Sequence, residues 1–134
     1  MNNSDESSKA KVSLLKEARR QILSLHKLLV DEERKDFERI NGKITSGQFL
    51  NLLVNNSDFQ WLRTFSILIV EIDEMFDLDD GFTENMIENY LTQIRDLINL
   101  GSVDEDFRVN YKEFIQTNSE VALKHNELKK LLKE

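Results

Sequence analysis

The sequence contains no cysteine and no proline among its 134 residues, and only four glycines. Without cysteine the chain forms no disulfide and offers no thiolate for metal binding or nucleophilic chemistry. Proline breaks helices most strongly and glycine comes next, so a chain nearly free of both favours long helices. The composition therefore predicts an all-α protein without thiol chemistry.

Long hydrophobic runs are also missing. The longest nearly apolar run covers residues 67–72 and still includes Glu71, whereas a membrane-spanning helix needs about 20 apolar residues. The polar stretch of residues 1–11 lacks the apolar segment of a secretory signal peptide. We therefore expect a cytoplasmic protein with no membrane partner.

Positive charge is scarce in the middle of the chain. Residues 45–106 hold two Lys/Arg against thirteen Asp/Glu, while residues 1–44 hold ten against eight and residues 107–134 hold six against four. The net charge is −7. Such a middle argues against a phosphate-binding surface, so no nucleic-acid partner is expected. It also predicts that the basic terminal segments pair with the acidic middle.

The apolar residues follow a helical period. Between residues 8 and 41 they recur three to four positions apart, which predicts one long helix that ends at Asn41-Gly42. Its stripe consists of Leu15, Ala18, Ile22, Leu25 and Leu29. Residues 1–7 are polar and are predicted to be a disordered tail. The remainder, residues 8–134, is predicted to form a single domain.

Polar caps divide the rest of the chain into four further helices. We expect a short connecting helix from Thr45 or Ser46 to Val54, and a mostly apolar central helix over residues 57–76. A helix capped by Thr83 ends at Gly101, and a last one opens at Ser102 or Asp104 and reaches residue 132. Its polar middle, residues 116–120, is a predicted point of kinking.

These elements predict a four-helix bundle of up-down-up-down order with one short connecting helix. The first and last helices are longer than the other two. Their ends are therefore expected to overhang together, and to pair as a two-helix extension or as a dimer contact. The overhanging residues are Leu14, Leu15, Leu128, Leu131 and Leu132.

Neither of two tests for a metal site gives a match. In the acidic stretch of residues 77–88, Asp77, Asp79 and Glu88 fit a calcium loop, but Gly81 stands one position before the turn glycine that such a loop requires. The two histidines, His26 and His125, lack the spacing of helical metal ligands. We expect no metal and no cofactor.

The best candidate for a ligand-binding residue is Arg63, which with Arg95 supplies the only cations of residues 45–106. It follows Trp61 at the start of the most apolar helix. One interpretation is an internal ion pair with Glu32, Glu33 or Asp36. The other is an anion-binding cleft. The candidate ligand-binding residues are Trp61, Arg63, Glu33 and His26.

We find no catalytic motif in the sequence. Ser66 and His26 have no third residue to orient them and no turn that would build an oxyanion hole. The basic residues of the first helix suit contact with an acidic partner or, less well, with nucleic acid, and ordinary exposure to solvent explains them as well. These residues are Lys9, Lys11, Lys16, Arg19, Arg20 and Lys27.

One distinctive motif is the segment Phe59-Gln60-Trp61-Leu62-Arg63. Mainly through this segment, residues 22–76 resemble a family of small uncharacterised bacterial helical proteins. The resemblance also includes Leu25-His26-Lys27, Glu33-Arg34, Phe37-Glu38, Gly42, Ser66 and Ile72-Asp73-Glu74. It implies a bacterial, cytosolic, all-α protein, and no activity or cofactor comes with it.

We therefore expect a non-enzymatic helical module for protein–protein interaction or regulation, with self-association as a homodimer through the overhanging ends as one form of it. The alternative is a bundle that binds a small anion or another small ligand with Arg63 and Trp61. A deep pocket that holds an unpaired Arg63 would favour the alternative, and an Arg63 paired with a carboxylate would count against it.

Overall fold

The computed structural model describes residues 3–101 and 104–133, and in this part of the chain every regular element is helical. The predicted all-α class is therefore confirmed. The first helix, α1, covers Asn3–Asn41 and is about 58 Å long at 1.5 Å per residue. It ends where predicted, at Gly42, whose φ of 87° suits glycine best. It begins inside the segment that we predicted as a disordered tail.

The predicted central helix is in fact two elements. After α2 (Ser46–Asn55), Asn56 caps a 3-10 helix, η1 (Ser57–Leu62), and α3 follows as Arg63–Phe76. Thr45 caps α2 in the predicted position and forms a reciprocal capping box with Gln48. The tighter winding of η1 changes the direction in which successive side chains point.

The predicted last helix is also divided. Thr83 caps α4 (Glu84–Ile98), and Asp104 caps α5 (Glu105–Thr117). Asn118 then leaves the helical conformation, with φ −127° and ψ 115°, and caps α6 (Ser119–Leu131). This break falls in the polar stretch that we expected to kink. The alternative cap, Ser102, lies outside the described residues.

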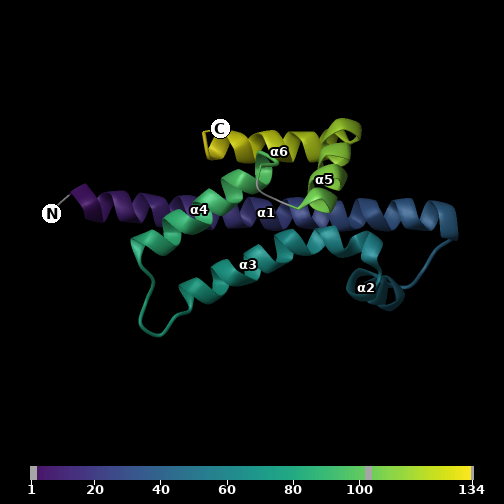
Figure 1. Ribbon diagram of the computed structural model, residues 1–134, viewed down its shortest axis with the longest axis horizontal. Helices are drawn as coiled ribbons and strands as arrows, with labels where there is room; N and C mark the ends of the chain where they lie inside the picture. The colour runs from purple at the N-terminus through teal and green to yellow at the C-terminus, as the bar shows by residue number, and fades with distance from the viewer. Residues whose placement is uncertain (1–2, 102–103, 134) are drawn as a thin grey trace.

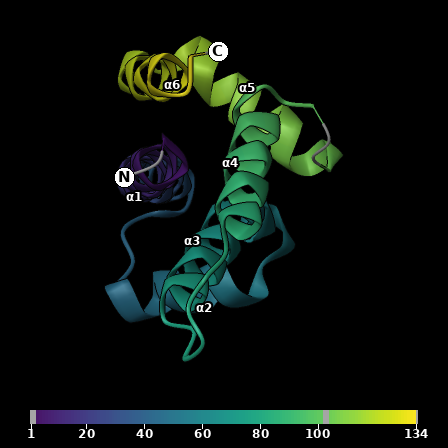
Figure 2. The same ribbon diagram turned by 90° about the vertical axis from the view of Figure 1, so that its left-hand side faces the viewer.

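The long helix α1 organises the molecule, and α3, α4 and α6 all pack against it. Figure 1 shows α3 and α4 diverging from the loop that joins them, while α6 runs beside α1 in the opposite direction. Seen nearly along α1, α3 and α4 lie on one side of it and α6 lies on another (Figure 2). The described part of the chain therefore has six α-helices and one 3-10 helix, where we expected five helices.

The predicted stripe of α1 is the centre of the core, because all five of its residues are fully buried. Burial of each leucine or isoleucine contributes about 1.5–3 kcal/mol. Three of the five leucines that we expected to overhang are covered within the chain, since Leu15 and Leu128 are fully buried and Leu132 is 3% exposed, while Leu14 and Leu131 are partly buried. The packing of α6 on α1 thus gives the two-helix pairing and leaves these three leucines unavailable for a dimer contact.

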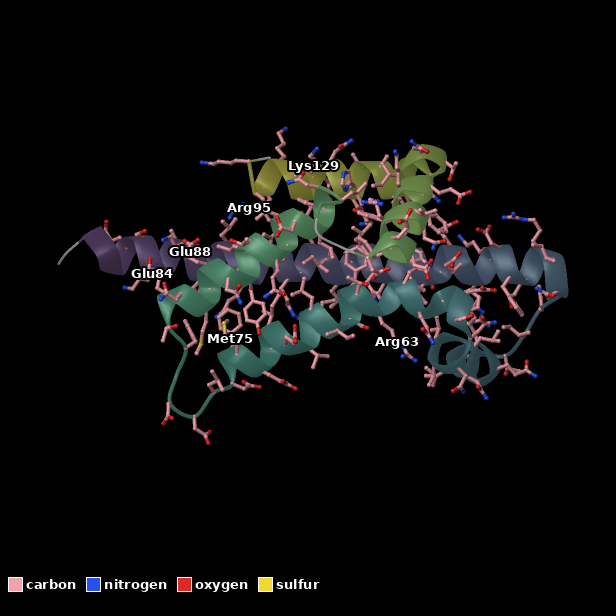
Figure 3. All side chains as sticks on the ribbon, in the orientation of Figure 1. Arg63, Met75, Glu84, Glu88, Arg95 and Lys129 are labelled. Atoms are coloured by element: carbon pink, nitrogen blue, oxygen red, sulfur yellow. The ribbon has the colours of Figure 1, made fainter. Side chains whose placement is uncertain are left out.

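Opposite charges on α1 and the acidic middle pair as predicted. Lys11 lies 2.8 Å from Glu84 and 2.7 Å from Glu88 on α4, and Arg19 lies 2.8 Å from Asp73 on α3. Figure 3 shows Glu84 and Glu88 on α4 beside the N-terminal half of α1. Exposed pairs of this kind contribute about 0–1 kcal/mol each. They therefore fix the alignment of α1 more than they stabilise the fold.

Candidate functional site

The four candidate residues lie in two separate hollows. Glu33 and Trp61 border a cleft of about 660 Å³ between the C-terminal half of α1, η1 and the start of α5. His26 and Arg63 border a smaller hollow of about 220 Å³ beside α2. The structure thus brings the four together in pairs and not as one site.

In the larger cleft, which we call the Trp61 cleft, the indole is nearly buried, with 3% of the residue exposed. Its Nε1 donates a hydrogen bond of 3.1 Å to Glu33 Oε2. The ring stacks on Phe114 with 5.9 Å between centroids and contacts Phe107 at 6.1 Å. The indole therefore anchors α5 to η1 and holds one carboxylate of α1 in a fixed position.

The electrostatics of the Trp61 cleft are acidic. Besides Glu33 it is bordered by Asp36, Asp58 and Asp106, and no lysine or arginine is among its lining residues. Burial raises the pKa of Glu33, and the nearby carboxylates of Asp36 and Asp58 raise it further, while the hydrogen bond from Trp61 opposes the shift. A cleft with this lining repels an anion, which is the ligand that the sequence suggested.

Arg63 is exposed, contrary to the expectation of a partly buried side chain, and it points away from α1 (Figure 3). Its Nη2 donates a hydrogen bond to the carbonyl of Val54 at the end of α2. The predicted ion pair with α1 is wrong. Each of the three carboxylates proposed for it has another partner: Glu32 pairs with Lys35, Asp36 pairs with Arg39, and Glu33 accepts from Trp61.

His26 is a packed histidine beside the core. Its ring lies 6.3 Å from that of Phe65, and burial lowers its pKa, which a hydrogen bond with the backbone of Leu62 partly offsets. Ser66 borders the same hollow, but its hydroxyl donates to the carbonyl of Arg63 at 3.1 Å. The hydroxyl is thus occupied in holding the first turn of α3.

Two residues of the acidic stretch of residues 77–88 have roles in the fold. Glu88 pairs with Lys11, and the Thr83 hydroxyl accepts from the backbone N–H of Met86 as the cap of α4. Within residues 3–101 and 104–133, no group of three or more histidine, aspartate or glutamate side chains could hold a metal ion. Over the same residues, none of the helices combines the length and apolar character that a membrane crossing requires.

A buried polar pair escaped the sequence analysis, which considered His125 only as a metal ligand. The Tyr111 hydroxyl lies 2.7 Å from His125 Nδ1 and joins α5 to α6 across the break at Asn118. Tyr111 is fully buried and His125 is 8% exposed. Burial raises the pKa of Tyr111 and lowers that of His125, so both groups are neutral, and the tautomer of the imidazole decides which of them donates the hydrogen bond. A pair enclosed in this way has a structural role.

A second surface feature is a groove along the junction of α3 and α4, which we call the α3–α4 groove. It consists of one hollow of about 480 Å³ and another of about 330 Å³, and Glu71 borders both. The remaining lining residues are mostly apolar or acidic: Thr64, Ile67, Leu68, Glu74, Met75, Leu78, Met86, Asn89, Tyr90, Gln93, Asp96, Leu97 and Asp104. Figure 3 shows Met75 on α3 where this helix faces α4.

The sequence held a signal for this groove that we did not use. The outward residues of α3 recur at helical spacing on the side opposite its core face: Ile67, Val70, Glu71 and Glu74. A helix that is apolar on most of its circumference was predicted to be the central one. In the structure this face of α3 is exposed instead.

No protein-family model, no curated protein and no solved structure matches this chain. The functional assignment therefore depends on the residues and geometry described above.

Proposed function

We propose that this protein is a non-enzymatic helical module for protein–protein interaction and that the α3–α4 groove is its docking surface. One observation carries the proposal: large apolar side chains are exposed together along this groove. Ile67 is 55% exposed, Leu78 is 45% exposed and Met86 is 37% exposed, and Val70 beside them is 53% exposed. Clusters of exposed apolar side chains rimmed by polar residues are typical of interaction sites.

A photo-crosslinking experiment in cells tests this function. A photoreactive amino acid at position 67 should give a discrete crosslinked adduct of higher mass, because the Ile67 side chain would lie in the interface. The matched control is position 123, because Leu123 on α6 is 58% exposed and does not border the groove. Equal labelling at both positions, or none at position 67, would contradict the proposal.

The alternative function, binding of a small anion by Arg63 and Trp61, has less support. The two side chains border different hollows, and the Trp61 cleft is lined with carboxylates. A thermal-shift measurement with inorganic phosphate tests it, because a ligand that binds only the folded state raises the melting temperature. A rise that is lost in Arg63→Ala would restore this alternative.

Self-association has less support than a partner of another kind, because three of the leucines that suggested it are buried within one chain. Sedimentation at high concentration would detect a dimer. Nucleic acid is disfavoured as a partner by the acidic groove. The resemblance described above implies a bacterial cytosolic protein, and this compartment is part of the proposal.

The proposal also includes a class of architecture. We take α1, α3, α4 and α6 as the frame of an up-down-up-down four-helix bundle, with α2, η1 and α5 as connections. The alternating course of these four helices in Figure 1 supports this description. The divergence of α3 from α4 then leaves the groove as the open side of the bundle.

A further inference from the structure

We infer that the α3–α4 groove binds a basic amphipathic helix of a partner protein, and this inference rests on the function proposed above. It adds the chemistry of the partner: a helix with an apolar stripe flanked by lysine or arginine side chains. Four features of the described residues lead to it, namely the length of the groove, its apolar floor, its acidic rim and the way in which the same two helices already bind α1.

The dimensions of the groove suit a short helix. Its lining residues on α3 run from Thr64 to Met75, a length of about 17 Å at 1.5 Å per residue. A partner helix of about 11 residues, or three turns, therefore matches this part of the groove. Helices that bind in grooves typically present an apolar stripe three to four residues apart over this length.

The rim of the groove has exposed carboxylates among its described residues. Glu71, Glu74 and Asp96 are exposed, and no lysine or arginine borders the groove. Within the described residues neither Glu71 nor Glu74 has an ion-pair partner within 4.0 Å. Burial raises the pKa of Tyr90 in the groove, and the charges of Glu71 and Glu74 raise it further. The local field is therefore negative and favours a cationic partner.

The opposite side of the same helix pair shows how such a partner is held. There α1 lays its apolar stripe against α3 and α4, while Lys11 reaches Glu84 and Glu88, and Arg19 reaches Asp73. The acidic residues on that side thus have basic partners within the chain. The groove has the same combination of apolar and acidic residues, but no basic helix of the described chain lies on it.

A second copy of this chain is a poorer occupant. If two copies met through the same groove, Glu71 and Glu74 of one would face the same residues of the other, and like charges in an interface oppose association. The overall charge of −7 acts in the same direction. A basic helix from a different protein is instead attracted both by the carboxylates of the groove and by the overall negative charge.

Binding of designed peptides to the full chain tests the inference. The probe is a fluorescent helical peptide of about 16 residues, with leucine in an i, i+3, i+4, i+7 stripe and lysine elsewhere. One counterpart has glutamate in place of lysine, and another has alanine in place of leucine. Fluorescence anisotropy should show saturable binding of the Leu/Lys peptide that is weakened by salt, and at least tenfold weaker binding of both counterparts.

Two pairs of protein variants separate docking from general attraction to an acidic protein. Glu71→Lys should weaken binding by about tenfold, or about 1.4 kcal/mol, whereas Glu127→Lys, the same charge change on α6, should change it less than twofold. Ile67→Asp adds a negative charge, so general attraction predicts tighter binding and docking predicts about tenfold weaker binding. Leu123→Asp is its control at matched exposure. Circular dichroism checks that each variant is folded.

Failure of the Leu/Lys peptide to bind, or equal effects of each variant and its control, would overturn the inference. Tight binding of the Leu/Glu peptide would refute the basic partner and leave the groove as a docking surface. An adduct at position 67 together with failure of the Leu/Lys peptide would likewise retain the function and reject its basic partner. Absence of the adduct would remove the function itself.

Discussion

Loss of the Tyr111 hydroxyl should destabilise the fold far more than the small size of the change suggests. Tyr111→Phe removes the 2.7 Å hydrogen bond to His125 and leaves the buried Nδ1 of that ring without its partner. An unsatisfied buried group of this kind costs about 1–3 kcal/mol. For a domain of this size the melting temperature should fall by about 4 °C for each kcal/mol. The free energy of unfolding is measured by urea titration followed by circular dichroism.

The chain offers a matched control in its other tyrosine. Tyr90 is half-buried in the α3–α4 groove, so Tyr90→Phe should change the free energy of unfolding by less than about 0.5 kcal/mol. In the double variant Tyr111→Phe/His125→Leu both polar partners are apolar, and its cost should be lower than the sum of the two single costs. Equal costs for the two tyrosine variants, or strict additivity in the cycle, would refute the reasoning.

The same pair predicts how stability depends on pH. Burial, and then the charge of Lys129, lowers the pKa of folded His125, so the folded state takes up a proton less readily than the unfolded state. The stability that neutral His125 gives to the folded state is therefore fully present above the unfolded pKa of about 6.5 and is lost as the pH falls below that value. His26 acts in the same sense. His125→Leu should flatten the decline in unfolding free energy between pH 7 and 5, and an unchanged slope would contradict this account.

Three further predictions concern other contacts. At pH 7 Glu33→Gln should raise the melting temperature, because it removes a partly buried charge but keeps an acceptor for Trp61. The gain should vanish as acid protonates Glu33, because the pKa of this carboxyl is raised in the folded state. A gain of the same size at pH 4 would contradict this. Asn118→Ala should cost about 0.5–2 kcal/mol in a urea titration, since it removes the cap of α6, whereas the exposed Asn126→Ala should cost much less. Phe65→Ala should cost about 3–5 kcal/mol in the same titration, and a cost below 1 kcal/mol would show that Phe65 is not central to the core.

The long helix, its buried stripe and most of the caps could be predicted from the sequence, because they depend on residues close together in the chain. Thr45, Thr83 and Asp104 cap the helices that follow them as expected. The exposure of one face of α3 could not be predicted in this way, because it depends on the angle between α3 and α4. That angle depends on contacts with α1, which lies far away in the sequence.

The separation of Trp61 from Arg63 had a local cause that the sequence analysis missed. Side chains two positions apart point about 200° apart on an α-helix and about 240° apart on a 3-10 helix. Two such residues therefore face different sides of their helix in either conformation. The hydrogen bond between Trp61 and Glu33 was harder to predict from the sequence, since it joins residues 28 positions apart. Only the packing of η1 on α1 brings them together.

The pairing of α1 with α6 has a consequence for synthesis of the protein on the ribosome. Ser24 and Lys124 are joined by a hydrogen bond across 100 positions of the chain. At about 5–20 residues per second, translation needs about 5–20 s to cover that distance. Throughout this interval the leucines that α6 will cover are open to water on the nascent chain. Newly made molecules are thus most exposed to aggregation or to chaperones while α6 is still being synthesised.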